Sequence, residues 1–172
     1  LEPGEEARWD KFVEAQQDGS PFHLTAWRDT IKSVFSFEHH FLVCEKAGDL
    51  QAVLPLFLVP GGLLNPKQLV SVPFGVYGGL CGEAQGARAE LLRHAEKLRA
   101  NTGASLMELR HFRRPVGTLP AKSLYVTYIK ELPSTPEKCM EAIPRKARAA
   151  ARKGLSSFGL RAGPLEKAPA SM

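Results

Sequence analysis

Residues 68–110 read QLVSVPFGVYGGLCGEAQGARAELLRHAEKLRANTGASLMELR, and this stretch decides the fold. An apolar run over 68–72 predicts a strand, and residues 106–110 predict another. Between them, residues 87–102 carry apolar side chains at helical spacing and are followed by Gly103, a residue type that often ends helices. A helix that joins two strands is typical of a crossover between parallel neighbours in one sheet.

The residues before this stretch predict two helices and a pair of strands. Apolar residues at helical spacing predict helices over 5–17 and 25–35. Residues 41–45 and 50–59 predict two strands joined by the turn Gly48-Asp49. The expected fold class is therefore α/β (α+β), with a mixed sheet flanked by helices on both faces.

The residues after it predict one more strand, over 123–131, and then a helix that Pro144 interrupts. The helix beyond Pro144 is basic and is expected to end at Gly154. We expect three regions along the chain: a domain over 1–133, a basic interdomain helix over 134–154, and the start of a second domain or a tail over 155–172.

The composition is ordinary for a globular protein, with 44% hydrophobic and 24% charged residues. Its three cysteines are too scattered for a disulfide framework or a CxxC metal site, and the histidines lack ligand spacing, so we expect no metal site. No signal peptide or membrane-spanning apolar run is visible, and we expect a cytoplasmic protein. Because the chain begins with Leu1 rather than Met and ends in a loose stretch over 163–172, we expect a fragment of a longer protein or a truncated gene model.

Positive charge concentrates near the end of the chain. Residues 138–167 carry eight basic and two acidic side chains, whereas the whole chain has a formal net charge of +5. The basic residues of the predicted helix fall on neighbouring stripes and are candidate phosphate ligands. They are Arg145, Lys146, Arg148, Arg152 and Lys153. A solvated helix face is an equally good interpretation of such a charge run.

Residues 73–82 form a glycine-rich loop that follows the strand predicted over 68–72. Gly78 and Gly79 would let the backbone approach a ligand closely, and Phe74 and Tyr77 offer aromatic surface. A tight connection that packs its own aromatic rings is the alternative. The spacing of the glycines matches neither a P-loop nor a dinucleotide-binding loop.

Glu108 and Arg110 fall on one face of the strand predicted over 106–110, because side chains alternate along a strand. Opposite charges are unusual on an interior strand, and they form a structural ion pair or line a cleft. We favour the ion pair. No nucleophile elbow or HExxH metal motif occurs, and Cys81 is expected to be a small buried residue.

Six short motifs follow one another along residues 8–160. They are Trp9-Asp10 with Phe12-Val13; Pro21-Phe22-His23 with Trp27; Val53-Leu54-Pro55-Leu56; Leu69-Val70-Ser71 with Pro73-Phe74 and Tyr77-Gly78-Gly79; Leu106 with Glu108-Leu109-Arg110; and Ile143-Pro144-Arg145-Lys146 with Arg148 and Arg152-Lys153-Gly154. In this order they resemble FemAB-like proteins, and above all the branch associated with exosortase/PEP-CTERM exopolysaccharide systems.

The resemblance implies two domains similar to the GNAT acyltransferase fold, of which this chain would hold the first and the start of the second. The full-length protein would transfer an acyl or aminoacyl group to an amine acceptor in peptidoglycan or exopolysaccharide synthesis. Its donor would be acyl-CoA or aminoacyl-tRNA. The missing C-terminal GNAT-like domain would be the partner of this chain, which would bind no cofactor and would be inactive alone.

The resemblance also implies roles for the residues already singled out. Glu108 is the candidate for contacting the amine, and Tyr77 the candidate for shaping its pocket. The residues expected to bind substrate are Phe74, Tyr77, Gly78, Gly79 and Arg110. The basic helix would bind tRNA or a nucleotide-linked or lipid-linked precursor. Two other classes stay open: an RNA- or phosphate-binding module, and a structural domain that packs against a partner.

Overall fold

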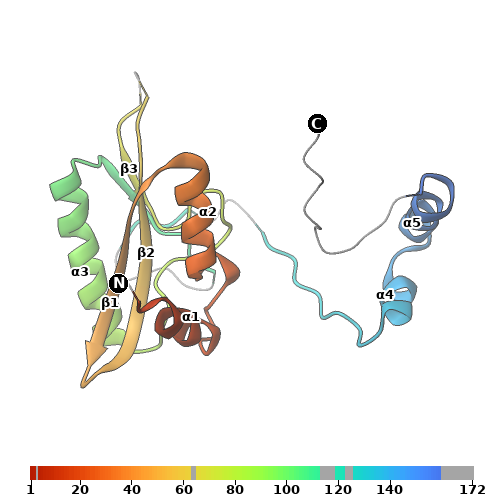
Figure 1. Ribbon diagram of the computed structural model, residues 1–172, viewed down its shortest axis with the longest axis horizontal. Helices are drawn as coiled ribbons and strands as arrows, with labels where there is room; N and C mark the ends of the chain where they lie inside the picture. The colour runs from red at the N-terminus through yellow and green to blue at the C-terminus, as the bar shows by residue number, and fades with distance from the viewer. Residues whose placement is uncertain (3, 63–64, 113–118, 123–125, 160–172) are drawn as a thin grey trace. The chain divides into compact units, whose positions relative to one another are not determined.

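The computed structural model describes residues 1–172 except 3, 63–64, 113–118, 123–125 and 160–172 (Figure 1). The chain divides into two units, Leu1–Lys122 and Ser123–Met172. Within the described residues, the first unit contains the sheet and the helices that cover it. The second contains the two helices nearest the C-terminus.

A four-stranded mixed sheet forms the centre of the first unit, in the order β1-β2-β3-β4. The strands are β1 (Glu38–Lys46), β2 (Asp49–Val59), β3 (Gln68–Val70) and β4 (Leu106–Glu108). β2 pairs antiparallel with both β1 and β3, whereas β3 pairs parallel with β4. Parallel neighbours need a long connection, which α3 (Gln85–Thr102) supplies. The predicted crossover and the mixed sheet are therefore confirmed.

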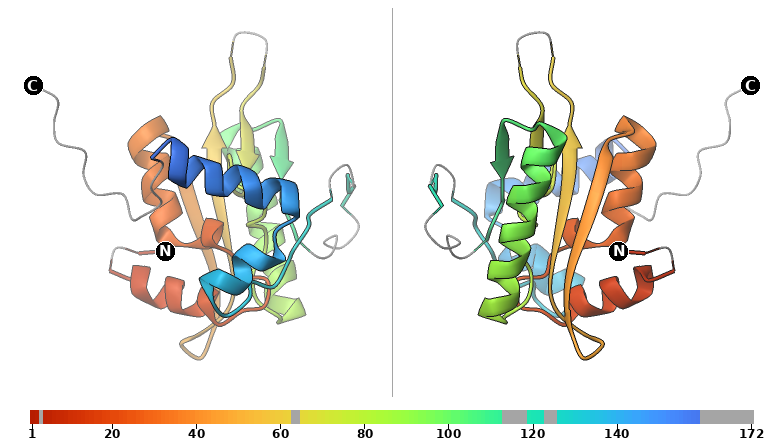
Figure 2. Two further views of the ribbon diagram at one scale, coloured as in Figure 1. Left: turned by 90° about the vertical axis from the view of Figure 1, so that its right-hand side faces the viewer. Right: turned by 90° about the vertical axis from the view of Figure 1, so that its left-hand side faces the viewer.

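Helices cover both faces of the sheet. α3 lies on one face, toward the viewer in the right-hand view of Figure 2, and α1 (Glu6–Glu14) and α2 (Thr25–Phe35) lie on the other. The short 3₁₀ helix η1 (Pro21–His23) connects α1 with α2. Side chains alternate along the central strand β2, so Leu54 packs with α3 while Val53 packs with α1 and α2.

The strongest periodic patterns predict the helices well. The prediction for α2 is confirmed at both ends, and α3 starts two residues before its predicted start. Of its expected core face, Leu91 and Ala95 are buried and Leu98 is partly buried. Other predicted ends are wrong: α1 stops at Glu14, β1 extends over Glu38–Lys46, β3 stops at Val70, β4 stops at Glu108, and the basic helix continues through Gly154.

The strand predicted over 123–131 is wrong for its described part. Residues 126–131 adopt no strand, and Tyr128 is 93% exposed. A strand is stable only when a neighbour satisfies its backbone groups, and no strand in the described part of the chain pairs with these residues. Residues 123–125 lie outside the described residues. So do residues 160–172, most of the region predicted to start a second domain.

The second unit contains α4 (Pro136–Ala142) and α5 (Arg145–Ser157). The guanidinium of Arg148 reaches back from α5 and donates hydrogen bonds to the carbonyls of Glu141 and Ile143, both at 3.2 Å. The last carbonyls of a helix have no partner within it, and Arg148 therefore satisfies the end of α4. This contact fixes the turn between the two helices.

We expect Leu91→Ala to lower the free energy of unfolding by about 2–5 kcal/mol, because the side chain of Leu91, on α3, is buried against the sheet. Leu132→Ala is the matched control, since Leu132 is 84% exposed and its truncation should change stability by less than about 0.5 kcal/mol. Urea unfolding followed by circular dichroism measures both. Equal effects of the two substitutions would contradict the packing of α3.

Candidate functional site

Residues 71–82, between β3 and α3, form a segment that contains the glycine-rich loop predicted over 73–82. We call it the anchored loop, because polar side chains from four other segments hold its backbone. Most of its residues are buried, whereas Phe74 and Val76 are exposed and Tyr77 is partly exposed. Its inner side is therefore part of the core, and its outer side is available to a ligand.

Arg110 holds the first half of the anchored loop. Its Nη1 donates to the carbonyl of Gly75 at 2.7 Å and to that of Val72 at 3.3 Å. Its Nε donates to Glu108 Oε1 at 2.6 Å, which makes the ion pair that the sequence favoured. The backbone carbonyl of Arg110 also accepts from the amide of Gly78 at 2.9 Å. Arg110 thus braces the loop, and Glu108 orients Arg110.

His23 and Ser20, from η1 and the residue before it, hold the second half. His23 Nε2 lies 2.9 Å from the carbonyl of Gly79, and because a carbonyl only accepts, Nε2 carries the proton. The single proton of the Ser20 hydroxyl faces two acceptors, the carbonyl of Tyr77 at 2.7 Å and the unprotonated His23 Nδ1 at 2.9 Å. Burial lowers the pKa of His23, so the ring is held in its neutral form.

His111, just beyond β4, accepts a hydrogen bond on Nε2 from the amide of Leu80 at 3.0 Å. This contact requires an unprotonated Nε2. Burial, helped by the positive charge of Arg88, lowers the pKa of His111 to about 4. The ring is therefore neutral at physiological pH, and it acts as a fixed acceptor for the anchored loop.

Asp18 and Arg88 hold the end of the loop, where α3 begins. Asp18 Oδ1 accepts from the amide of Gly82 at 3.2 Å, and Oδ2 pairs with Arg88 Nη1 at 2.9 Å. Arg88 also donates to the carbonyl of Gly82 at 2.7 Å. Burial works to raise the pKa of Asp18, but the hydrogen bonds from Gly82 and Arg88 outweigh it and lower that pKa.

Gly78 and Gly79 are required by packing inside the protein. A Cβ atom on Gly78 would lie 2.3 Å from Val72 Cγ1, and one on Gly79 would lie 2.6 Å from His111 Nε2. Both distances are far shorter than van der Waals contact. The geometry therefore accounts for these glycines by the tight connection that the sequence offered as an alternative, without close approach of a ligand.

The outer side of the loop carries apolar side chains that face solvent. Phe74 is 64% exposed, and its ring stacks on that of Phe35 with centroids 4.6 Å apart. Its φ of 62° lies in the left-handed region, which a bulky residue rarely adopts and which is frequent at ligand-binding sites. Val34 and Val76 are also exposed. These four residues (Val34, Phe35, Phe74 and Val76) are called the aromatic patch below.

Tyr77 lies beside the aromatic patch but is held differently. Its ring is 4.7 Å from that of Phe112 and 6.4 Å from that of Phe22, measured between centroids. The ring is thus clamped between residues from η1 and from the segment after β4. A ring held in this way could form one wall of a pocket, the role that the family resemblance implied for Tyr77 and that stays a prediction.

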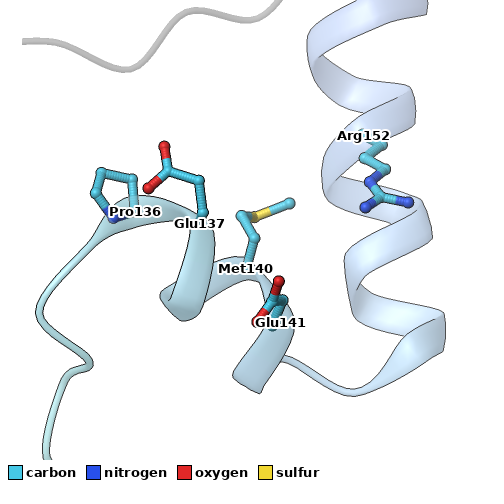
Figure 3. A pocket seen from close by; sticks show the side chains of 5 residues that line it. All are labelled: Pro136, Glu137, Met140, Glu141 and Arg152. Atoms are coloured by element: carbon cyan, nitrogen blue, oxygen red, sulfur yellow. The ribbon is translucent and has the colours of Figure 1, made fainter.

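The predicted phosphate ligands lie on α5 in the second unit. Four of them are exposed: Arg145, Lys146, Arg152 and Lys153. Arg148 is partly buried, and its Nη2 donates hydrogen bonds to the carbonyls at the end of α4. Arg152 also lines a shallow hollow of about 330 Å³ (Figure 3). The other lining residues, all on α4, are Pro136, Glu137, Met140 and Glu141.

The potentially reactive side chains beside the anchored loop are one thiol and two histidines. Burial and the neighbouring Asp18 carboxylate raise the pKa of the Cys81 thiol, which makes Cys81 a poor nucleophile. Both buried histidines are engaged with the loop backbone. No cluster of three metal-binding side chains occurs among the described residues. Within the same residues, no helix is long and apolar enough to cross a membrane.

Sequence reasoning found one of the four anchors and missed the other three. Strand alternation brought Glu108 and Arg110 together. Asp18, Ser20 and His23 lie more than fifty residues from the loop atoms that they hold, and no periodic pattern marks such contacts.

No protein-family model matches the sequence. No curated protein matches it either. Among solved structures, the chain is similar to the crystal structure of FemX, with a TM-score of 0.58 at 17% sequence identity. That match covers 88% of this chain and 42% of the FemX chain, so the chain spans less than half the length of FemX.

A second similar structure is a GNAT family acetyltransferase from Staphylococcus aureus subsp. aureus USA300_TCH1516. The TM-score is 0.51 at 10% identity, over 75% of this chain and 95% of that one. At such identities the likeness concerns the fold alone. It confirms the expected fold class, a GNAT-like mixed sheet flanked by helices, and the fold shared with FemX makes the architecture FemAB/GNAT-like.

We expect Gly79→Ala to destabilise the first unit by about 1–3 kcal/mol, because the new methyl group would overlap the His111 ring. Gly86→Ala is the matched control: no atom lies within 4 Å of its Cβ position inside α3. That substitution should stabilise the helix by about 0.5–1 kcal/mol. Thermal unfolding measures the stability of both variants. If only Gly86→Ala destabilised the protein, the close packing of Gly79 against the His111 ring would be refuted.

The lowered pKa of His111 predicts a pH dependence of stability. The folded-state pKa of about 4 lies below the ordinary value of 6.5, so the fold binds this proton less well than the unfolded chain. Its contribution, roughly 3 kcal/mol, is complete above pH 6.5 and is lost as the pH falls toward 4.

His111→Gln tests this, because a glutamine oxygen can accept from the Leu80 amide without titrating. The free energy of unfolding is measured by urea titration at several values between pH 7 and pH 4. The slope over this range should be smaller in the variant than in the wild type. Equal slopes would show that the ring does not titrate as the geometry requires.

Proposed function

We propose that this chain is the N-terminal half of a FemAB-like N-acyl- or aminoacyltransferase of cell-envelope synthesis. The FemAB/GNAT-like fold supports transfer of an acyl group to an amine, since one structural neighbour is a GNAT family acetyltransferase. The acceptor would be an amine of a peptidoglycan or an exopolysaccharide precursor. The sequence motifs favour the exosortase-associated branch, and with it the exopolysaccharide form.

The observation that carries the proposal is a rigid loop that turns aromatic side chains outward. Its backbone is held by Arg110, His23, His111 and Asp18, so Phe74 and Tyr77 keep their positions before a ligand arrives. A preorganised apolar wall orients a substrate at little entropic cost. We therefore assign the aromatic patch and Tyr77 to one wall of the acceptor cleft.

The other site residues have supporting roles in this proposal. Arg110 positions the loop, and Gly78 and Gly79 allow its tight packing. Glu108 is the group that would contact the amine. Its carboxylate is partly exposed, and although its Oε1 is paired with Arg110, the carboxylate could still accept hydrogen bonds from an ammonium group.

Transfer itself would need groups outside this chain. The donor, acyl-CoA or aminoacyl-tRNA, would be bound chiefly by a second GNAT-like domain. We therefore expect no amine acylation by residues 1–172 alone with either donor. Robust turnover by the purified chain would contradict the assignment as a half-enzyme.

A second candidate function is binding of phosphate groups by α5. Its support is separate, because Arg145, Lys146, Arg152 and Lys153 are all exposed on one helix of the second unit. The ligand would be tRNA or a nucleotide-linked or lipid-linked precursor. Arginine suits such ligands, because its planar fork donates two hydrogen bonds to one phosphate.

We expect Phe74→Ala to weaken acceptor binding at least about tenfold while the fold survives, because Phe74 is the most exposed ring of the aromatic patch. The measurement is an NMR titration of the purified chain with a lysine-containing stem peptide and with an amino sugar. Phe158→Ala is the matched control, since it removes an equally exposed ring from the second unit. Equal affinities of all three proteins would refute the acceptor wall.

A further inference from the structure

α5 presents two chemically different faces. Successive residues of a helix are rotated by about 100°, which places four basic side chains within an arc of about 120°. This cationic face consists of Arg145, Lys146, Arg152 and Lys153. The opposite arc carries only apolar and small residues. This apolar face consists of Ala147, Ala150, Ala151, Gly154 and Leu155. Phe158 follows the last residue of the helix and adds an exposed ring beside Lys153.

Both faces lack a partner in the described part of the chain. No ion pair involves the cationic face there, and Lys153 contacts only the ring of Phe158, with its Nζ 5.8 Å from the ring centroid. Leu155 is 57% exposed and Phe158 is 67% exposed. Exposed apolar side chains next to concentrated charge mark an interaction surface.

Arg148 does not belong to this surface. Its Nη2 is spent on the carbonyls of Glu141 and Ile143, and the residue is partly buried. It fixes the turn between α4 and α5 and so holds the start of α5. The remaining four cations form no ion pair within the described residues, although Arg152 lines the hollow that also contains Glu137 and Glu141.

Two large anionic surfaces could attract these cations: RNA and the headgroups of a lipid bilayer. RNA would use the charges but would leave Leu155 and Phe158 without a partner. A bilayer uses both faces, because phosphates meet the cations while acyl chains accept the apolar side chains. Helices that lie in a membrane surface combine these same features: basic residues on one side, and Leu or Phe on the other.

We propose that α5 binds the surface of an anionic lipid bilayer, with its apolar face toward the acyl chains and its cationic face at the headgroup phosphates. The inference does not rest on transferase activity, since it needs neither donor nor acceptor. For an enzyme of envelope synthesis, it would hold the protein at the membrane that carries a lipid-linked precursor.

Sedimentation of the full chain with lipid vesicles tests the proposal. One set of vesicles is pure phosphatidylcholine, and the other contains about one third phosphatidylglycerol. We expect binding to the anionic vesicles only, and weaker binding as salt is added, because salt screens the attraction. A parallel band-shift assay with bulk tRNA measures whether the chain binds RNA instead.

Two substitution sets separate the contributions of the faces. Changing the four residues of the cationic face to Gln should weaken vesicle binding at least about tenfold, because each cation contributes about fivefold. The matched control changes four exposed lysines of the first unit to Gln, with the same loss of charge, and should change binding less than about twofold. These lysines are Lys11, Lys46, Lys67 and Lys97.

The second set is Leu155→Ser with Phe158→Ser, which should also weaken vesicle binding at least about tenfold. Its control is Ile129→Ser with Leu132→Ser, which removes similar exposed apolar surface elsewhere in the second unit. Circular dichroism verifies that every variant keeps its helices. Three results would each overturn the proposal: no binding to anionic vesicles, equal losses in a set and its control, or binding to tRNA without binding to vesicles.

Discussion

An irregular loop at the centre of the first unit can be buried only if other segments satisfy its backbone. The anchored loop makes few of the regular hydrogen bonds of a helix or a strand, and an unpaired buried amide or carbonyl is costly. Arg110, His23, His111 and Asp18 supply the missing partners. Because these residues come from η1, from the segment after α1 and from the end of β4, the same contacts also join the elements of the unit.

This requirement explains the character of the proposed site. The polar side chains around the loop form hydrogen bonds with its backbone, and the side chains that face solvent are aromatic and aliphatic. In the proposed function this surface binds and orients a substrate, and groups from a second domain remove the proton and make the bond. The proposed half-enzyme, which provides one wall of a cleft, fits this division.

The parts of the fold that sequence predicts are those governed by short repeats. The periods of α2 and α3 and the crossover follow from residues within one element, and strand alternation found the pair Glu108 and Arg110. The strand expected over 123–131 failed because residue preference cannot supply a neighbour to pair with. His23 and His111 were missed as anchors because only the folded chain brings them to Gly79 and Leu80. A sequence pattern cannot report hydrogen bonds between such distant residues.

Amide hydrogen exchange measured by NMR tests the central claim most directly. The amides of Gly78, Leu80 and Gly82 donate to Arg110, His111 and Asp18, so they should exchange nearly as slowly as the buried amides of β2. Exchange as fast as that of the exposed turn at Gly48 would contradict the account. In that case the loop would be mobile before binding, and a preformed acceptor wall would not exist.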